Sequence, residues 1–161
     1  MSGLTNKYVE DIGKEHCRDF IGTFPCNILP EIEGKESFSV IFNESRHDEE
    51  GTHFVAVFAN KEKIFYFDSL GLKCENKYIN SFIETSGREI KENNVQIQSY
   101  NSIFCGYFCL SFIIFMTKKY EYDKYFEIFS KDNLKLNDTI TVDLLLAMIM
   151  MKNKINFYDE K

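Results

Sequence analysis

Four residues of this 161-residue chain could act together in acyl transfer by a thiol. Cys105 stands directly before a long apolar run, so it would lie at a helix N-terminus, where the helix dipole favours a thiolate. His53 opens one apolar segment and Asp68 closes the next, and in a hairpin these two positions lie at the same edge. A carboxylate beside a histidine holds one tautomer and favours the imidazolium.

Gln98 precedes Cys105 and could offer its side-chain amide to a developing oxyanion. The backbone N–H of Cys105, free at the start of a helix, would be a second donor. The predicted roles are therefore Cys105 as nucleophile, His53 as base and acid, Asp68 as the orienting partner of the histidine, and Gln98 as oxyanion donor.

Each of these residues also has a purely structural interpretation. A histidine at the start of a strand is commonly structural or solvated, and an aspartate in the sequence Asp-Ser-Leu-Gly of residues 68–71 is a typical turn former. Cys105 and Cys109 could be two small buried residues on one helix face. A zinc site is a further alternative, but the chain lacks a second matching pair of ligands. We therefore expect no metal and no cofactor.

The elements that would position these residues follow from hydrophobic periodicity and turn signals. Helices are expected over 5–19, 76–86, 105–120, 122–130 and 142–152, and strands over 38–42, 53–59, 64–68 and 95–98. Residues 20–25 are expected to form a turn or a short extended stretch, and Asp138 or Thr141 to cap the last helix. This order predicts an α+β fold with a mostly antiparallel sheet packed by helices.

Composition sets the limits of the fold and of the partners. The chain is 44% hydrophobic with 16 Phe and 9 Tyr, which favours a single packed domain over 1–161 and excludes intrinsic disorder. A net charge of -6 argues against a nucleic-acid partner, and the apolar runs are too short to cross a membrane. Five cysteines without a signal-peptide pattern indicate free thiols in an intracellular, reducing compartment.

Two blocks of the chain match a known family. Residues 98–109, QSYNSIFCGYFC, contain Gln98 and the Cys-Gly pair at the family spacing, and residues 51–58 and 65–71 contain His53 and Asp68. The sequence resembles the adenovirus-type cysteine proteases, the adenains, and their relatives in Mavericks and virophages. Their fold group also includes the proteases of ubiquitin-like modifiers. The resemblance covers about residues 20–116 and implies that these four residues are catalytic in a papain-like fold.

The sequence departs from the family in two places. Phe54 stands where the family often has Trp, and the stretch 87–96 lacks the cysteine by which adenovirus protease binds an activating peptide. An activating peptide is therefore retained as a candidate partner, without that disulfide.

The resemblance implies a viral endopeptidase that cleaves capsid or core precursors at Gly-containing, Gly-Gly type sites during particle maturation. It would act as a monomer in the infected cell, in cytoplasm or nucleus, with packaging in virions as a further option. Two alternatives remain open at this point. One is a deconjugating protease for a ubiquitin-like modifier, and the other is a non-catalytic interaction module that has kept the fold.

Overall fold

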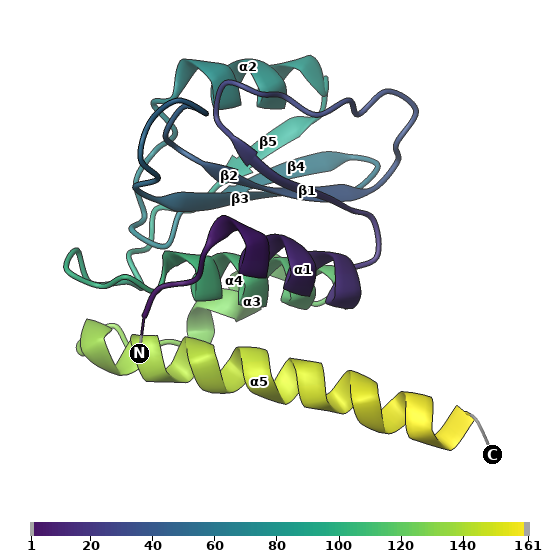
Figure 1. Ribbon diagram of the computed structural model, residues 1–161, viewed down its shortest axis with the longest axis vertical. Coiled ribbons are helices and arrows are strands. Elements are labelled where there is room, and N and C mark those ends of the chain that lie inside the picture. The colour runs from purple at the N-terminus through teal and green to yellow at the C-terminus, as the bar shows by residue number, and fades with distance from the viewer. Residues whose placement is uncertain (1, 160–161) are drawn as a thin grey trace.

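A mixed five-stranded sheet organises the computed structural model, which describes residues 2–159, with side chains described as far as residue 152 (Figure 1). The strands are β1 (Phe20–Pro25), β2 (Phe38–Asn43), β3 (Phe54–Ala59), β4 (Lys63–Phe67) and β5 (Glu89–Glu92). The helices are α1 (Asn6–His16), α2 (Lys77–Thr85), α3 (Cys105–Thr117), α4 (Tyr122–Glu127) and α5 (Leu134–Asp159). The predicted α+β class is confirmed.

The strands lie in the sheet in their order along the chain. The three central strands β2, β3 and β4 are antiparallel, as predicted, whereas β1 and β5 run parallel to their neighbours at the two edges. Residues 20–25, expected as a turn or extended stretch, form the edge strand β1. Alternation of side chains along each central strand sends one set of apolar residues to each face.

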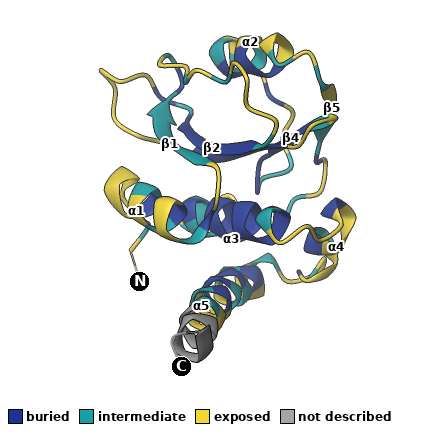
Figure 2. Cartoon of the chain, turned by 90° about the vertical axis from the view of Figure 1, so that its right-hand side faces the viewer, coloured by how far each residue is buried: buried dark blue, intermediate teal, exposed yellow. Residues whose placement is uncertain are grey.

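One face of the sheet packs on α1 and α3, and α5 lies below α3 as an outer layer (Figure 1). Helix α3 is apolar around its whole circumference because it lies between the sheet and α5. Phe67 of β4 stacks on Phe112 of α3 with ring centroids 4.4 Å apart. Figure 2 shows α3 buried along most of its length. This packing fixes the start of α3 relative to the sheet.

Helix α2 covers the opposite face of the sheet (Figure 1). The side chain of Asn76 caps it by accepting hydrogen bonds from the backbone N–H groups of Tyr78 and Ile79. Ile79, Phe82 and Ile83 form the buried stripe expected from the periodicity of this segment.

The predicted strand over 95–98 is wrong. The strand that pairs with β4 is instead β5. It begins at Glu89, six residues before the start of the predicted strand. The apolar residues Val95 and Ile97 favoured a strand there, but a sheet edge tolerates the polar sequence Glu-Ile-Lys-Glu of β5 because one side of it faces solvent.

The predicted start of the last helix is also wrong, because α5 begins at Leu134. Asp138 and Thr141 lie inside it and face neighbouring elements. Asp138 accepts a hydrogen bond from Ser102, and the buried Thr141 contacts the hydroxyl of Ser111 in α3. In the sequence these two polar residues resembled helix caps, whereas in the structure they make hydrogen bonds to other elements.

Among residues 2–159, no helix is both long enough and apolar enough to cross a membrane.

Candidate active site

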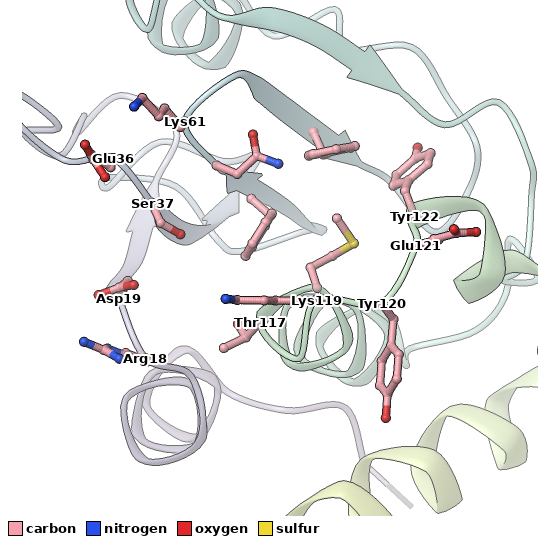
Figure 3. Close-up of a pocket in the computed structure, with 14 residues that line it drawn as sticks. Arg18, Asp19, Glu36, Ser37, Lys61, Thr117, Lys119, Tyr120, Glu121 and Tyr122 are labelled. Atoms are coloured by element: carbon pink, nitrogen blue, oxygen red, sulfur yellow. The ribbon is translucent and has the colours of Figure 1, made fainter.

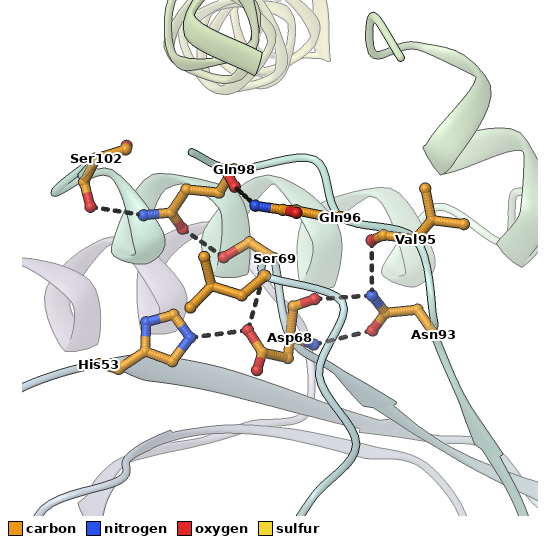
Figure 4. A network of polar contacts seen from close by, with 9 residues as sticks. His53, Asp68, Ser69, Asn93, Val95, Gln96, Gln98 and Ser102 are labelled. Carbon is orange, nitrogen blue, oxygen red and sulfur yellow. Dashed lines mark hydrogen bonds and ion pairs between the residues drawn. The ribbon is translucent and has the colours of Figure 1, made fainter. Parts of the chain in front are cut away.

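His53 and Asp68 lie side by side at one end of the β3–β4 hairpin (Figure 4). His53 directly precedes β3 and Asp68 directly follows β4, so the antiparallel pairing brings them together. Nε2 of His53 is 2.8 Å from Oδ1 of Asp68. Because a carboxylate only accepts, Nε2 carries the proton and donates it, which leaves Nδ1 as the ring nitrogen available to another partner.

Asp68 is held by more than its histidine. Its carboxylate oxygen Oδ1 also accepts from the backbone N–H of Leu70 at 2.9 Å. The side chain of Asn93 hydrogen-bonds the backbone N–H and the backbone carbonyl of Asp68, at 2.9 and 2.7 Å. Sequence reasoning missed Asn93, because an asparagine after a strand usually indicates a turn. Its position directly after β5 gave no signal either, because β5 was not predicted from the sequence.

Cys105 is the first residue of α3, and its side chain is partly exposed. Its backbone N–H is one of those at a helix start that have no intrahelical acceptor. The glycine that follows Cys105 is a packing position. Gly106 is buried, and a Cβ there would lie 3.2 Å from Leu4 and 3.3 Å from Val9. Gly106 therefore lets the start of α3 pack closely on α1 and on the segment before it.

The electrostatic environment keeps His53 protonated. Burial lowers the pKa of His53, but hydrogen bonds and charge interactions with Asp68 and Cys105 outweigh that effect and raise the pKa to about 10. The thiol of Cys105 and the imidazole of His53 line the same pocket. His53 thus links the carboxylate and the thiol.

Gln98 lies buried in the same region, with its amide fixed at both ends (Figure 4). Nε2 donates to the backbone carbonyl of Ser102 at 2.8 Å, and Oε1 accepts from the hydroxyl of Ser69 at 2.5 Å. An amide nitrogen has two hydrogens, so one remains available to a bound group.

A pocket of about 320 Å³ brings three of the four predicted site residues to one cavity. Its lining includes His53, Gln98 and Cys105, together with the apolar side chains Leu4 and Ile103. A neighbouring pocket of about 510 Å³ shares His53 and is lined by Asp68. The other three predicted residues therefore lie around His53, which lines both pockets.

A larger pocket of about 710 Å³ lies at the other end of α3 and contains none of the four predicted residues (Figure 3). It is lined by both acidic and basic side chains, including Arg18, Asp19, Lys119 and Glu121. Size alone does not make it a site for thiol chemistry, because its lining contains neither a cysteine nor a histidine.

The other four cysteines are buried. Burial raises the pKa of the Cys17 thiol to about 12 and of the Cys74 thiol to about 11, and raises the pKa of Cys109 well above its ordinary value. Along the described part of the chain, no group of three His, Cys, Asp or Glu side chains is placed to hold a metal ion. The zinc alternative has no ligand set there.

Comparison with solved structures finds the same fold in a protease. Two structures of the ASFV pS273R protease superpose with a TM-score of 0.57 at 17% identity. The alignments cover 87% of this chain and 67% or 66% of that protease. The SUMO protease Ulp1 superposes with a TM-score of 0.49 at 11% identity, over 89% of this chain and 79% of that one. The fold predicted from the sequence is thus shared with a viral protease.

A particular sequence relative is R355 of Acanthamoeba polyphaga mimivirus, whose given name proposes that it is a thiol protease. The two sequences are 34% identical over 102 residues, which is 56% of this chain and 33% of the mimivirus protein. The chain therefore spans about a third of the length of this relative. No model of a known protein family matches the sequence.

Proposed function

We propose that this protein is a viral cysteine endopeptidase that uses Cys105, His53, Asp68 and Gln98. The observation that carries the proposal is the position of His53, which donates to Asp68 at 2.8 Å and lines one pocket with Cys105, the first residue of α3. A purely structural role for the histidine would not require both a carboxylate and a thiol beside it.

In the first step the sulfur of Cys105 attacks the carbonyl carbon of the scissile peptide bond, and a C–S bond forms. His53 holds the thiol proton on Nδ1, since Nε2 is occupied by Asp68. Asp68 keeps this tautomer and stabilises the imidazolium.

The oxyanion of the tetrahedral intermediate would lie between two donors. One is the backbone N–H of Cys105, and the other is the second amide hydrogen of Gln98. Both are held before the substrate arrives, because α3 is buried between the sheet and α5 and the Gln98 amide is bonded at both ends. Fixed donors need no reorganisation as charge develops.

Collapse of the intermediate breaks the C–N bond, and His53 gives its proton to the departing amine. Water then attacks the thioester, with His53 accepting a proton from it, and release of the acid restores the thiol. No metal or cofactor takes part in these steps.

We propose capsid or core precursors as substrates, cut at Gly-containing, Gly-Gly type sites within the infected cell. The similarity to a mimivirus protein named for thiol protease activity supports a viral role. The fold shared with the ASFV protease agrees with it.

The test is processing of co-expressed precursor proteins of the parent virus by the wild type, Cys105→Ala and His53→Ala. We expect cleavage by the wild type alone, at bonds that follow glycine. Cleavage that persists in Cys105→Ala would contradict the mechanism. Processing confined to the C-terminal tail of a folded ubiquitin-like modifier would favour the deconjugating alternative, and precursor binding without any cleavage would favour an interaction module.

A further inference from the structure

The orientation of the Gln98 amide depends on a serine outside the four predicted site residues. Ser69 is fully buried, and its hydroxyl lies 2.5 Å from Oε1 of Gln98. On the other side of the amide, Nε2 of Gln98 donates to the carbonyl of Ser102. Figure 4 shows the amide between these two partners.

The two hydrogen-bond partners of the Gln98 amide differ in whether they can donate a hydrogen bond. The carbonyl of Ser102 can only accept, and the hydroxyl of Ser69 can donate, so together they favour the orientation with Nε2 toward Ser102. Rotation of the amide by 180° would place Oε1 of Gln98 against the backbone carbonyl oxygen of Ser102, and two acceptors would then face each other. Without the hydroxyl of Ser69, Oε1 would be a buried acceptor without its donor.

The backbone of Ser69 joins the same two segments. Its carbonyl accepts from the N–H of Ile97 at 2.9 Å and from the N–H of Gln98 at 3.0 Å. Ser69 also follows Asp68 directly in the chain. Ser69 therefore joins the turn that carries the carboxylate of the site to the segment that carries its amide.

We propose that Ser69 is a positioning residue, which fixes the amide of Gln98 with one N–H directed at the oxyanion. This inference rests on the proposed function for its effect on catalysis, but the orientation of the amide can be measured without any substrate.

The variant is Ser69→Ala, and the matched control is Ser39→Ala. Ser39 is also a buried serine, and within the described residues its hydroxyl has no hydrogen-bond partner. The probe for hydrolysis is a fluorogenic peptide amide that ends in Gly-Gly. We expect Ser69→Ala to lower kcat about tenfold, as the loss of roughly one hydrogen bond implies, with KM unchanged. Ser39→Ala should match the wild type.

A double variant separates positioning from general damage. If Ser69 acts through Gln98, Ser69→Ala should have no further effect on kcat in a Gln98→Ala background. Alkylation of Cys105 by iodoacetamide gives an independent readout, because this substitution at carbon develops no oxyanion. The alkylation rate should be the same in the wild type and in Ser69→Ala. An equal fall in alkylation and hydrolysis, or additive effects in the double variant, would overturn the proposal.

Nitrogen-15 NMR of the Gln98 side chain tests the orientation directly. In the wild type its NH₂ hydrogens should exchange slowly with solvent, and in Ser69→Ala they should exchange faster. Unchanged exchange in Ser69→Ala would overturn the inference whether or not the peptide is cut. A wild type that has the protected amide but does not hydrolyse the probe would count against the proposed function and leave the positioning role supported.

Discussion

Asn93 hydrogen-bonds both backbone polar groups of Asp68, at 2.9 and 2.7 Å. The regular pairing of β4 with β5 ends at Tyr66 and Glu92, two residues before Asp68 and one residue before Asn93. Beyond the last backbone pair, the side chain of Asn93 supplies the hydrogen bonds to the backbone of Asp68. Asp68 leaves the sheet at a defined place, with its carboxylate directed at His53 (Figure 4).

Asn93→Ala should therefore reduce both stability and activity. The buried backbone groups of Asp68 would lose their partners, and we expect the free energy of unfolding to fall by about 1–3 kcal/mol. Urea unfolding and peptide hydrolysis measure the two effects. Asn94→Ala, at the exposed neighbouring asparagine, should change neither. Equal stability of the two variants would contradict this role of Asn93.

The turn after Asp68 predicts a contrast between two glycines. Gly71 and Gly34 both have positive φ, at 70° and 74°. A Cβ at Gly71 would lie 2.6 Å from the backbone nitrogen of Gln96, whereas at Gly34 it would meet open space. Gly34→Ala should cost about 1–2 kcal/mol for the left-handed backbone alone.

Gly71→Ala should cost more, because the turn must also move away from the segment that leads to Gln98. Thermal unfolding of the two variants gives the comparison. A cost at Gly71 no larger than at Gly34 would show that the turn yields without strain.

Gln98→Ala should lower kcat about 10²–10³-fold with little change in KM, because the oxyanion exists only after attack. Gln98→Glu should be no more active than Gln98→Ala, since a carboxylate donates no hydrogen bond at neutral pH and adds negative charge beside the oxyanion. Steady-state kinetics on one peptide measure both. A rise confined to KM would instead assign Gln98 to substrate binding.

Iodoacetamide at neutral pH should label Cys105 before any other cysteine. Cys105 alone is partly exposed, while burial raises the pKa of the Cys17, Cys74 and Cys109 thiols. Mass spectrometry of peptides over a time course identifies the labelled sites. His53→Ala should slow the reaction of Cys105. Rapid labelling of Cys109 in the folded protein would show that α3 presents another face.

The raised pKa of His53 predicts a pH-dependent contribution to stability. The folded pKa, about 10, lies above the ordinary value of 6.5, so the contribution is complete below pH 6.5 and is lost as pH rises toward 10. The stability advantage of the wild type over Asp68→Asn should therefore shrink between pH 6.5 and 10. Urea unfolding across this range measures it, and an advantage that grows with pH would contradict the assigned charge state.

The local sequence pattern was sufficient to predict elements that form within one continuous segment of the chain. Two segments rich in β-branched and aromatic residues, on either side of a short polar loop, predicted the β3–β4 hairpin, and that hairpin brings His53 to Asp68. The apolar run after Cys105 predicted a buried helix with the thiol at its start, which the structure confirms. The roles of these residues in catalysis stay predictions.

Elements placed by distant contacts were harder to predict. The polar strand β5 is a strand because β4 offers it an edge, and its own sequence gives little sign of that. Asp138 and Thr141 resembled helix caps, but they hydrogen-bond partners far away in the chain. Such contacts leave no local periodicity to detect.

The sequence by itself determined the residue types of the site, the hairpin and the buried helix, because each follows from local periodicity and composition. Only the tertiary structure decided how the amide of Gln98 is oriented and how the backbone of Asp68 is held. Ser69 and Asn93 do this through hydrogen bonds to residues that are 29 and 25 positions away in the chain. A hydrogen bond between distant residues depends on the packing of the whole chain, and neighbouring residues do not encode it.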